Sequence, residues 1–405
     1  MPYLFATLLL IAFATANATP ANDDIRCDIP TAETDDGSDP IRSRAELDAW
    51  LARCPSPLDP LRPGTRQRFL DGLRFNERGV VDYPVDELTD ALTTDEIRRV
   101  SRLLGLDVMI PGLHPEEAVR LRGSKQPAGI SAIERRYDRF HEESRPLERE
   151  LDGAERGAAL VALYQSIFPS EVSTKAVGVH DLGLLYRAAS TTAFYSEDAR
   201  MTEVAQDAYA RLSASGLSTR SQAKDMMKLI LDAGRVNDAR ELALAEPEHE
   251  LPLLPTTRDG TNGRQDTSVW DLGARDALVR RHISLSPVRI VVRASLGCRY
   301  SMAAAEAIAA DPELGPLFRE HAVWLAPPAE LIGYERLRAW NTEHPHTPIV
   351  VAADWADWPM LDRWEGTPTF HVFRDGELTE SVTSWPIEEG NRDAVLDALR
   401  KAGLR

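Results

Sequence analysis

Cys298 is the residue of this sequence with the clearest potential for nucleophilic chemistry. It follows an apolar run of strand character, residues 289–294, and precedes an alanine-rich helical stretch, residues 302–310. A cysteine at the first turn of a helix lies beside unpaired backbone N–H groups and the positive end of the helix dipole, and both stabilise its thiolate. Arg299 adds a positive charge next to it. The pattern therefore predicts a thiolate that can attack a disulfide.

A second segment of interest, the sequence Gly-Thr-Pro-Thr that begins at Gly366, precedes another strand-like run later in the chain. This segment and the quartet Cys-Arg-Tyr-Ser that begins at Cys298 together resemble the two halves of a thioredoxin-fold active site. The resemblance implies that Pro368 is a cis-proline facing the sulfur and that Thr367 hydrogen-bonds the backbone of a bound client. Tyr300 is similar to the tyrosine in the Cys-Gly-Tyr-Cys motif of periplasmic disulfide isomerases. The quartet is also similar to the Cys-Arg-Phe-Ser of a thioredoxin-like chaperone of the endoplasmic reticulum.

Ser301 stands where the usual Cys-x-x-Cys motif has its second cysteine. That second thiol releases the client by attacking the mixed disulfide, which a serine cannot do because it forms no disulfide. The preceding strand also has Val291 and Val292 where thioredoxins place a buried acid, and the usual adjacent tryptophan is absent. We therefore expect monothiol chemistry, in which Ser301 hydrogen-bonds the Cys298 thiolate and an incoming thiol releases the adduct. The implied partners are client proteins with free or disulfide-bonded cysteines, or glutathione.

A second function remains open on the same residues. Cysteine is among the most frequently buried residue types, so Cys298 can also be an inert residue at a helix start. In that case the thioredoxin-like domain is redox-inactive, and the protein is a non-catalytic scaffold that binds partners through its groove.

The N-terminal residues indicate export. Residues 1–18 carry no charge, and the apolar run 4–13 is followed by Ala16-Asn17-Ala18, a small-x-small pattern that favours cleavage of a signal peptide after Ala18. The mature protein is then periplasmic or secreted, without stable membrane insertion. The lack of Lys and Arg before the run leaves an N-terminal anchor as the alternative, although a membrane span needs about 20 residues.

The net charge argues against one class of partner, and the cysteine content predicts a disulfide. A net charge of -17 argues against nucleic acid, since no basic stripe exists to bind phosphates. In an oxidising compartment two of the three cysteines can pair. Cys27 and Cys54 flank one helical stretch and are the predicted disulfide, worth about 3 to 4 kcal/mol in the chain-entropy model. The alternative is that Cys27 stays unpaired in an acidic leader.

The periodicity of the sequence changes once along the chain and predicts an α plus α/β fold. After the acidic leader 19–40, residues 41–245 are expected to form an α-helical domain, with capping boxes that begin at Ser43, Thr93 and Ser131. Residues 246–267 have the composition of a linker, and residues 268–405 alternate strand and helix as in a thioredoxin-like domain.

Two weaker sequence patterns concern a helix hairpin and the histidine and tryptophan residues near the C-terminus. Residues 226–243 look like one tetratricopeptide-type helix hairpin, although an ordinary helical bundle explains them as well. We expect no cofactor and no metal, because His344 and His346 flank a proline without further spaced ligands. His371 is expected to pack within its strand, with a place near the site as the alternative. The tryptophans Trp355, Trp358 and Trp364 are expected to pack in the core and the insert, with an aromatic rim beside Cys298 for an unfolded client as the alternative.

Overall fold

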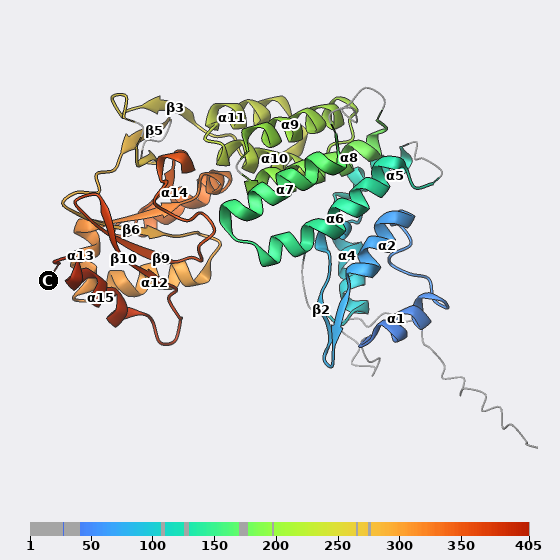
Figure 1. Ribbon diagram of the computed structural model, residues 1–405, viewed down its shortest axis with the longest axis horizontal. Helices are drawn as coiled ribbons and strands as arrows, with labels where there is room; N and C mark the ends of the chain where they lie inside the picture. Colours follow the sequence, from blue (N-terminus) through green and yellow to red (C-terminus); the bar gives the residue numbers. More distant parts are fainter. Residues whose placement is uncertain are drawn as a thin grey trace, which may run out of the picture.

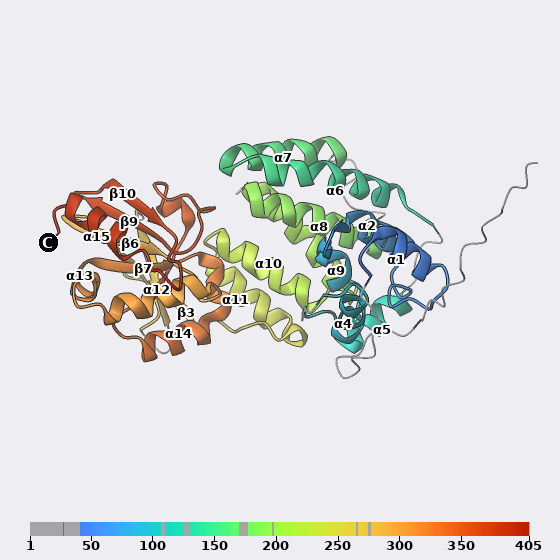
Figure 2. The ribbon, with the colours of Figure 1, turned by 90° about the horizontal axis from the view of Figure 1, so that it is seen from below.

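The computed structural model describes residue 27 and residues 41–106, 110–124, 129–169, 177–196, 198–264, 266–273 and 277–404. The predicted signal peptide and nearly all of the acidic leader lie outside the described residues. The chain combines helices with an eight-stranded mixed sheet (Figure 1). The sheet lies at one end of the molecule and the first helices at the other, with three helix hairpins between them (Figures 1 and 2).

The first helices form a small unit with its own hydrophobic core. Leu47, Phe69 and Ile97, each fully buried, lie at its centre. Its elements are α1 (Arg44–Leu51), α2 (Pro63–Gly72), β1 (Arg74–Asn76), β2 (Gly79–Asp82), α3 (Val85–Thr89) and α4 (Thr94–Leu103), and α5 (Pro115–Gly123) follows them. The hairpin β1–β2 was not expected in the helical segment 41–245, because strands this short carry no clear period.

The predicted capping boxes differ in how completely they form. At α4 the Thr93 side chain accepts from the Glu96 N–H and the Glu96 carboxylate accepts from the Thr93 N–H, as expected. Ser131 caps α6 (Ala132–Glu150) in the same way, but the carboxylate of Glu134 is buried and lies 3.5 Å from a guanidinium nitrogen of Arg68. In this second box only the Ser131 hydrogen bond forms, because the Glu134 carboxylate contacts Arg68 from another helix instead.

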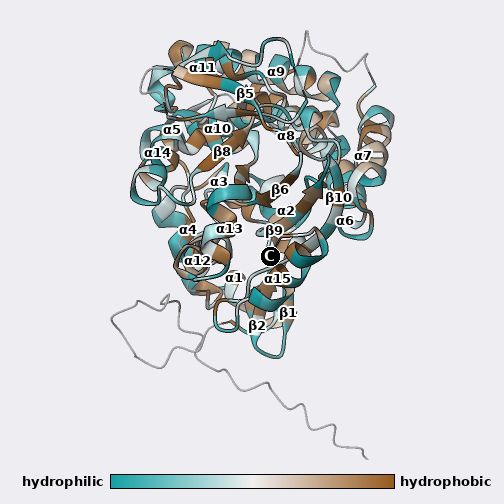
Figure 3. Ribbon diagram, turned by 90° about the vertical axis from the view of Figure 1, so that its left-hand side faces the viewer, coloured by the Kyte–Doolittle hydropathy of each residue, from teal (hydrophilic) through white to brown (hydrophobic). Residues whose placement is uncertain are grey.

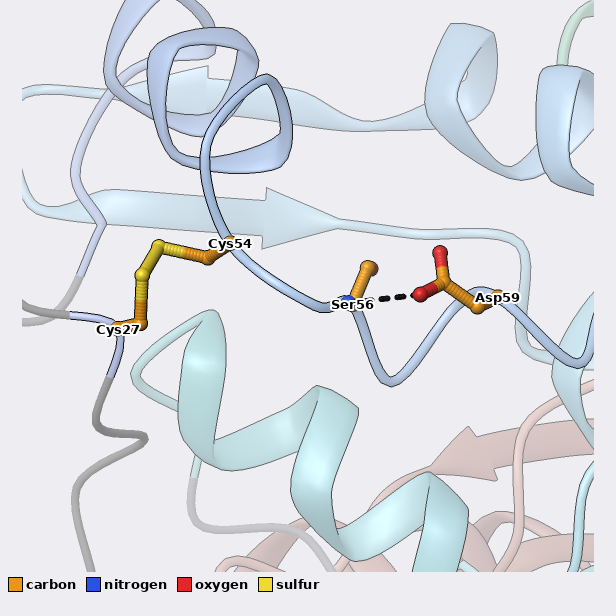
Figure 4. The surroundings of a disulfide bond; sticks show 4 residues. All are labelled: Cys27, Cys54, Ser56 and Asp59. Atoms are coloured by element: carbon orange, nitrogen blue, oxygen red, sulfur yellow. Dashed lines mark hydrogen bonds between the residues drawn. A yellow bond between two sulfur atoms is a disulfide. The ribbon is translucent and has the colours of Figure 1, made fainter.

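The predicted disulfide is present. Cys27 and Cys54 are bonded, with their Cα atoms 5.3 Å apart (Figure 4). Cys54 is buried in the core of the first unit, and just after it the Ser56 N–H donates to a carboxylate oxygen of Asp59 at 2.9 Å. The bond therefore ties residue 27 to the small unit.

Replacing Cys27 with serine is expected to lower the free energy of unfolding of this unit by about 3 kcal/mol. The reason is that the bond joins residues 27 positions apart, and an open loop of that size has more entropy in the unfolded chain. Urea unfolding without reductant, compared with Cys298→Ser as a control that removes a cysteine elsewhere, measures the difference. Equal midpoints for the two variants and the wild type would contradict the expectation.

Three antiparallel helix hairpins form the middle of the chain. They are α6 (Ala132–Glu150) with α7 (Gly153–Ile167), α8 (Val179–Ser196) with α9 (Ala199–Ala214), and α10 (Arg220–Asp232) with α11 (Val236–Ala245). The predicted hairpin of residues 226–243 is α10–α11, and Gly234 ends α10 with φ of 71°, a conformation that favours glycine. The first helices of the pairs contact one another, α6 with α8 and α8 with α10.

The sheet has the strand order β10-β9-β6-β7-β8-β4-β5-β3. Its strands are β3 (Thr256–Asp259), β4 (Ser268–Asp271), β5 (Ala277–His282), β6 (Val288–Arg293), β7 (Ala322–Ala326), β8 (Ile349–Ala352), β9 (Thr369–Arg374) and β10 (Glu377–Thr383). β6, β7 and β8 run parallel, whereas β9 is antiparallel to β6 and β10 to β9. Asp375 and Gly376, both at positive φ, close the predicted β9–β10 hairpin.

The expected linker 246–267 is only partly a linker. After the short 3₁₀ helix η2 (Pro247–His249), β3 pairs in parallel with β5 at the outer edge of the sheet. β4 was also not predicted and inserts between β8 and β5. Strand pairing of such short segments depends on partners far along the chain, which local composition does not reveal.

Helices cover one face of the sheet and an aromatic segment covers the other. The helices are α12 (Arg299–Ala310), α13 (Leu314–His321), α14 (Tyr334–Glu343) and α15 (Arg392–Lys401), which pack on the face that carries Val292 and Phe370. The opposite face, with Val291 and Phe373, packs against the buried Trp355 and Trp358. Figure 3 shows the hydrophobic colour on β6 and β9 inside this sandwich. Among the described helices, none combines the length and apolarity of a membrane span.

Candidate functional site

Cys298 lies at the N-cap of α12, directly after the loop that follows β6. It is the free cysteine of the described residues and is partly buried. Its N–H donates to the Ser295 carbonyl at 3.1 Å, and its own carbonyl accepts from the Met302 N–H at 3.2 Å, which starts the helix. The thiol therefore has the position at a helix start that the sequence predicts, although the helix begins at Arg299 rather than Met302.

The Thr-Pro segment lies against the sulfur. The Thr367–Pro368 peptide bond is cis. The Cys298 thiol donates to the Thr367 carbonyl, with Sγ 3.1 Å from the oxygen. Pro368 is buried, and its carbonyl accepts from the Ser384 N–H at 2.8 Å. Because β6 and β9 are direct neighbours in the sheet, the two segments meet at the same end of it.

The pKa of the Cys298 thiol lies below its ordinary value. Burial acts in the opposite direction, but hydrogen bonds from the Thr367 side chain, from the N–H and hydroxyl of Ser301 and from the Tyr300 N–H outweigh it. Ser301 is fully buried and its hydroxyl also accepts from the Ser295 N–H at 3.4 Å. Ser301 therefore lies next to the sulfur and hydrogen-bonds it.

Arg299 and Tyr300 pair with each other on the surface. The Arg299 guanidinium donates to the Tyr300 hydroxyl at 2.9 Å and stacks over its ring at 4.9 Å from the centroid. Both side chains are exposed, so solvent and salt screen the arginine charge from the thiolate. Hydrogen bonds, rather than the Arg299 charge that the sequence emphasises, thus lower the pKa of the Cys298 thiol.

A buried polar cluster behind the Thr-Pro segment was missed. Arg293, the last residue of β6, donates from its guanidinium to the carbonyls of Arg363 and Glu365. The His371 side chain is almost fully buried, with Nε2 2.9 Å from a carboxylate oxygen of Glu365 and Nδ1 2.9 Å from the Ser381 hydroxyl. Arg293 therefore fixes the segment that leads to Thr367. The sequence feature that could have predicted this cluster is a charged residue at the end of an otherwise apolar strand.

This cluster also sets two pKa values. Burial lowers the pKa of His371 to about 4, and the Arg293 guanidinium acts in the same direction. Burial raises the pKa of Glu365, helped by Asp362 and opposed by Arg293. We therefore assign a neutral imidazole to His371 at neutral pH.

The remaining candidates make packing contacts. Trp340 stacks on His344 with ring centroids 3.6 Å apart, and His346 is exposed. No group of three or more metal-ligating side chains occurs among the residues that the structure describes. Trp364, unlike Trp355 and Trp358, packs against aromatic rings of α8.

The residues of the site come from three places in the sequence. The loop before α12 supplies Ser295 and Cys298, the segment before β9 supplies Thr367, and the 3₁₀ helix η3 (Pro328–Gly333) supplies Glu330, which accepts from the Ser295 hydroxyl. A search of family models, curated proteins and solved structures finds no match to this chain.

Proposed function

We propose that this protein performs monothiol–disulfide exchange on client proteins through Cys298. The observation that carries the proposal is the free thiol at the N-cap of α12, 3.1 Å from the Thr367 carbonyl beside the cis Thr367–Pro368 bond. The lowered thiol pKa gives more thiolate at neutral pH than an ordinary cysteine has.

The element order supports a thioredoxin-like domain. From β6 onward the chain runs strand, helix, strand, helix, hairpin and helix, the order expected from the resemblance. α13, β8 and the aromatic segment after β8 are additions to that order. The Cys27–Cys54 disulfide supports export, because such bonds persist mainly in oxidising compartments.

The exchange proceeds in two balanced steps. The Cys298 thiolate attacks one sulfur of a client disulfide, so that a mixed disulfide forms while the client bond breaks and its second sulfur leaves as a thiolate. An incoming thiolate, from the client or from a small thiol such as glutathione, then attacks the mixed disulfide and restores Cys298. Once the thiolate has formed, the Thr367 carbonyl loses its donor and can accept from a client backbone N–H.

Alkylation distinguishes the exchange function from the second candidate, a scaffold with an inert cysteine. We expect Cys298 to react with iodoacetamide with an apparent pKa below that of an unstructured cysteine peptide measured alongside. The rate should rise with pH through that pKa, because the thiolate is the nucleophile. Ser301→Ala serves as a matched variant and should raise the apparent pKa, since it removes one hydrogen bond to the sulfur. A slow reaction with a normal or raised pKa would favour the scaffold.

Ser301→Cys is expected to give the protein a dithiol that reduces insulin with dithiothreitol as reductant. The new sulfur replaces a hydroxyl that already faces Cys298, so it can attack the mixed disulfide and release the client. The wild type should show little turnover. The double variant Cys298→Ala, Ser301→Cys controls for chemistry by residue 301 alone, and a Ser301→Cys protein no faster than this double variant would count against the site.

A further inference from the structure

A long groove lies on the inner side of the three helix hairpins. Its volume is about 600 Å³, well within the range for ligand sites. Side chains from α6, α8 and α10 line it, together with the segment around α3, whereas α7, α9 and α11 contribute none. Six aromatic side chains lie along it: Tyr83, Tyr137, Phe140, Tyr186, Phe194 and Tyr195.

The groove is elongated along two of its helices. On α8 its lining runs from Tyr186 to Tyr195, and on α10 from Ser221 to Asp232. At 1.5 Å per residue these stretches are about 14 Å and about 17 Å long. An extended polypeptide of four to five residues, at about 3.3 Å each, has the same length.

One end of the groove contacts residues that adjoin the two segments of the thiol site. Phe194 packs edge-on against Trp364, with ring centroids 5.1 Å apart, and its carbonyl accepts from Arg363 at 3.2 Å. Trp364 comes three residues before Thr367. On the other side Asp232 accepts from the N–H of Ala329, a groove residue that precedes Glu330.

Glu330 completes the second connection. Its carboxylate accepts from the Ser295 hydroxyl, which lies in the loop that ends at Cys298. The last turn of α8 thus contacts residues just before the Thr-Pro segment, and the last turn of α10 contacts η3, which in turn holds the cysteine loop. At this end, a chain lying in the groove reaches the residues that adjoin the thiol site.

The charges along the groove favour a cationic occupant. Five acidic residues line it, Asp86, Asp90, Glu148, Asp225 and Asp232, against the three basic residues Arg145, Arg187 and Lys228. Burial raises the pKa of Asp90 to about 7, so that residue is only partly ionised at neutral pH and the other four carry most of the negative charge. The whole chain carries a net charge of -17, so its long-range field has the same sign. Aromatic walls accommodate varied apolar side chains, while carboxylates select Lys and Arg.

We infer that this groove binds an extended, positively charged segment of the client and directs its cysteine to Cys298. The inference rests on the proposed exchange function and names its substrate class: unfolded cationic polypeptide with an accessible disulfide. Phe194, of which 43% is exposed, provides apolar contact at the end nearest the thiol.

The test uses two peptides of about ten residues, long enough to fill the groove at about 3.3 Å per residue. They share one apolar sequence, one is lysine-rich and the other glutamate-rich, and each carries one cysteine as its disulfide with 2-thiopyridine. Ser190→Trp fills the groove and Glu148→Lys reverses a lining charge. The matched controls Ala210→Trp and Glu203→Lys make the same changes at exposed positions of α9.

The cationic peptide should form its disulfide with Cys298 about tenfold faster than the acidic one, and less so at high salt. Ser190→Trp and Glu148→Lys should remove most of that advantage, and the controls should keep it. All variants should react equally with 2,2′-dithiodipyridine, a small neutral disulfide. Equal peptide rates in groove variants and controls would overturn the inference, whereas no reaction with the small disulfide would overturn the exchange function.

A second measurement keeps the inference testable if the thiol proves inert. Fluorescence anisotropy of a labelled, cysteine-free cationic peptide reports binding without chemistry. Ser190→Trp should weaken that binding about fivefold or more relative to Ala210→Trp. Equal affinity in the two variants would refute the groove as the client site.

Discussion

Cys298→Ala is expected to abolish all mixed disulfides between this protein and its clients. Cys27 and Cys54 are bonded to each other, which leaves Cys298 as the only thiol of the three cysteines. Quenching in acid, alkylation of the denatured protein at neutral pH and a non-reducing gel should show adducts for the wild type and none for the variant. The effect is complete rather than graded, because no bond can form without the sulfur.

Ser301→Ala should be compared with Cys298→Ala in the same experiment. It keeps the nucleophile and removes a hydrogen bond to the thiolate, so adducts should still form, but several times more slowly at neutral pH. Adducts that persist in Cys298→Ala would show that the Cys27–Cys54 pair exchanges instead. They would also assign the reactive end of the molecule to its first unit.

Lowering the pH from 7 to 5 is expected to destabilise the folded protein by several kcal/mol. Three histidines have their pKa lowered by burial, to about 4 for His141, about 3 for His180 and about 4 for His371. In the unfolded chain the same side chains bind a proton near pH 6.5. Between these values the unfolded state binds more protons, so stability is lost as the pH falls.

The size of this loss of stability follows from the three histidine pKa values. At pH 5 each buried histidine contributes on the order of 1–2 kcal/mol of destabilisation. Paired carboxylates add little above pH 5, because their unfolded pKa values lie near 4. Asp90 acts in the opposite direction: burial raises its pKa to about 7, so the folded state takes up a proton there as the pH falls, which offsets about one of the three histidines. Urea unfolding at the two pH values, followed by tryptophan fluorescence, measures the sum.

A single substitution isolates one of the three groups. His371→Gln can retain the hydrogen bond to Ser381 and removes the titration, so the stability difference between pH 7 and pH 5 should shrink by about 1–2 kcal/mol. His346→Gln changes an exposed histidine and should leave that difference unaltered. A shrinkage of the same size in both variants would mean that burial of His371 is not the cause.

The sequence predicts the local part of the thiol site well and its surroundings poorly. A cysteine between an apolar strand and an alanine-rich helix is a local pattern, and so is the Thr93 capping box. The direction of the Arg299 side chain does not follow from a local pattern. A long flexible side chain adopts one of several conformations that differ little in energy. Here the Tyr300 ring and hydroxyl outweigh a half-buried sulfur.

The missed elements share one physical cause. β3 and β4 are four residues each, and they become strands only because β5 and β8 offer unpaired edges. Arg293 is an isolated charge in an apolar strand, and its role depends on carbonyls about seventy residues away. Contacts over such separations leave no period in the local sequence.

By itself, the sequence determined a helix-start cysteine without a resolving partner and a change from helical to strand-and-helix periodicity. It predicted the disulfide between Cys27 and Cys54 but left an unpaired Cys27 open, and the structure shows the bond. Only the tertiary structure decided that Thr367 lies against the sulfur, that part of the expected linker joins the sheet, and that α6, α8 and α10 line one groove. The reason is that helix starts and cysteine counts are properties of neighbouring residues. Strand pairing and helix packing are decided by buried surfaces that meet only after the chain has folded.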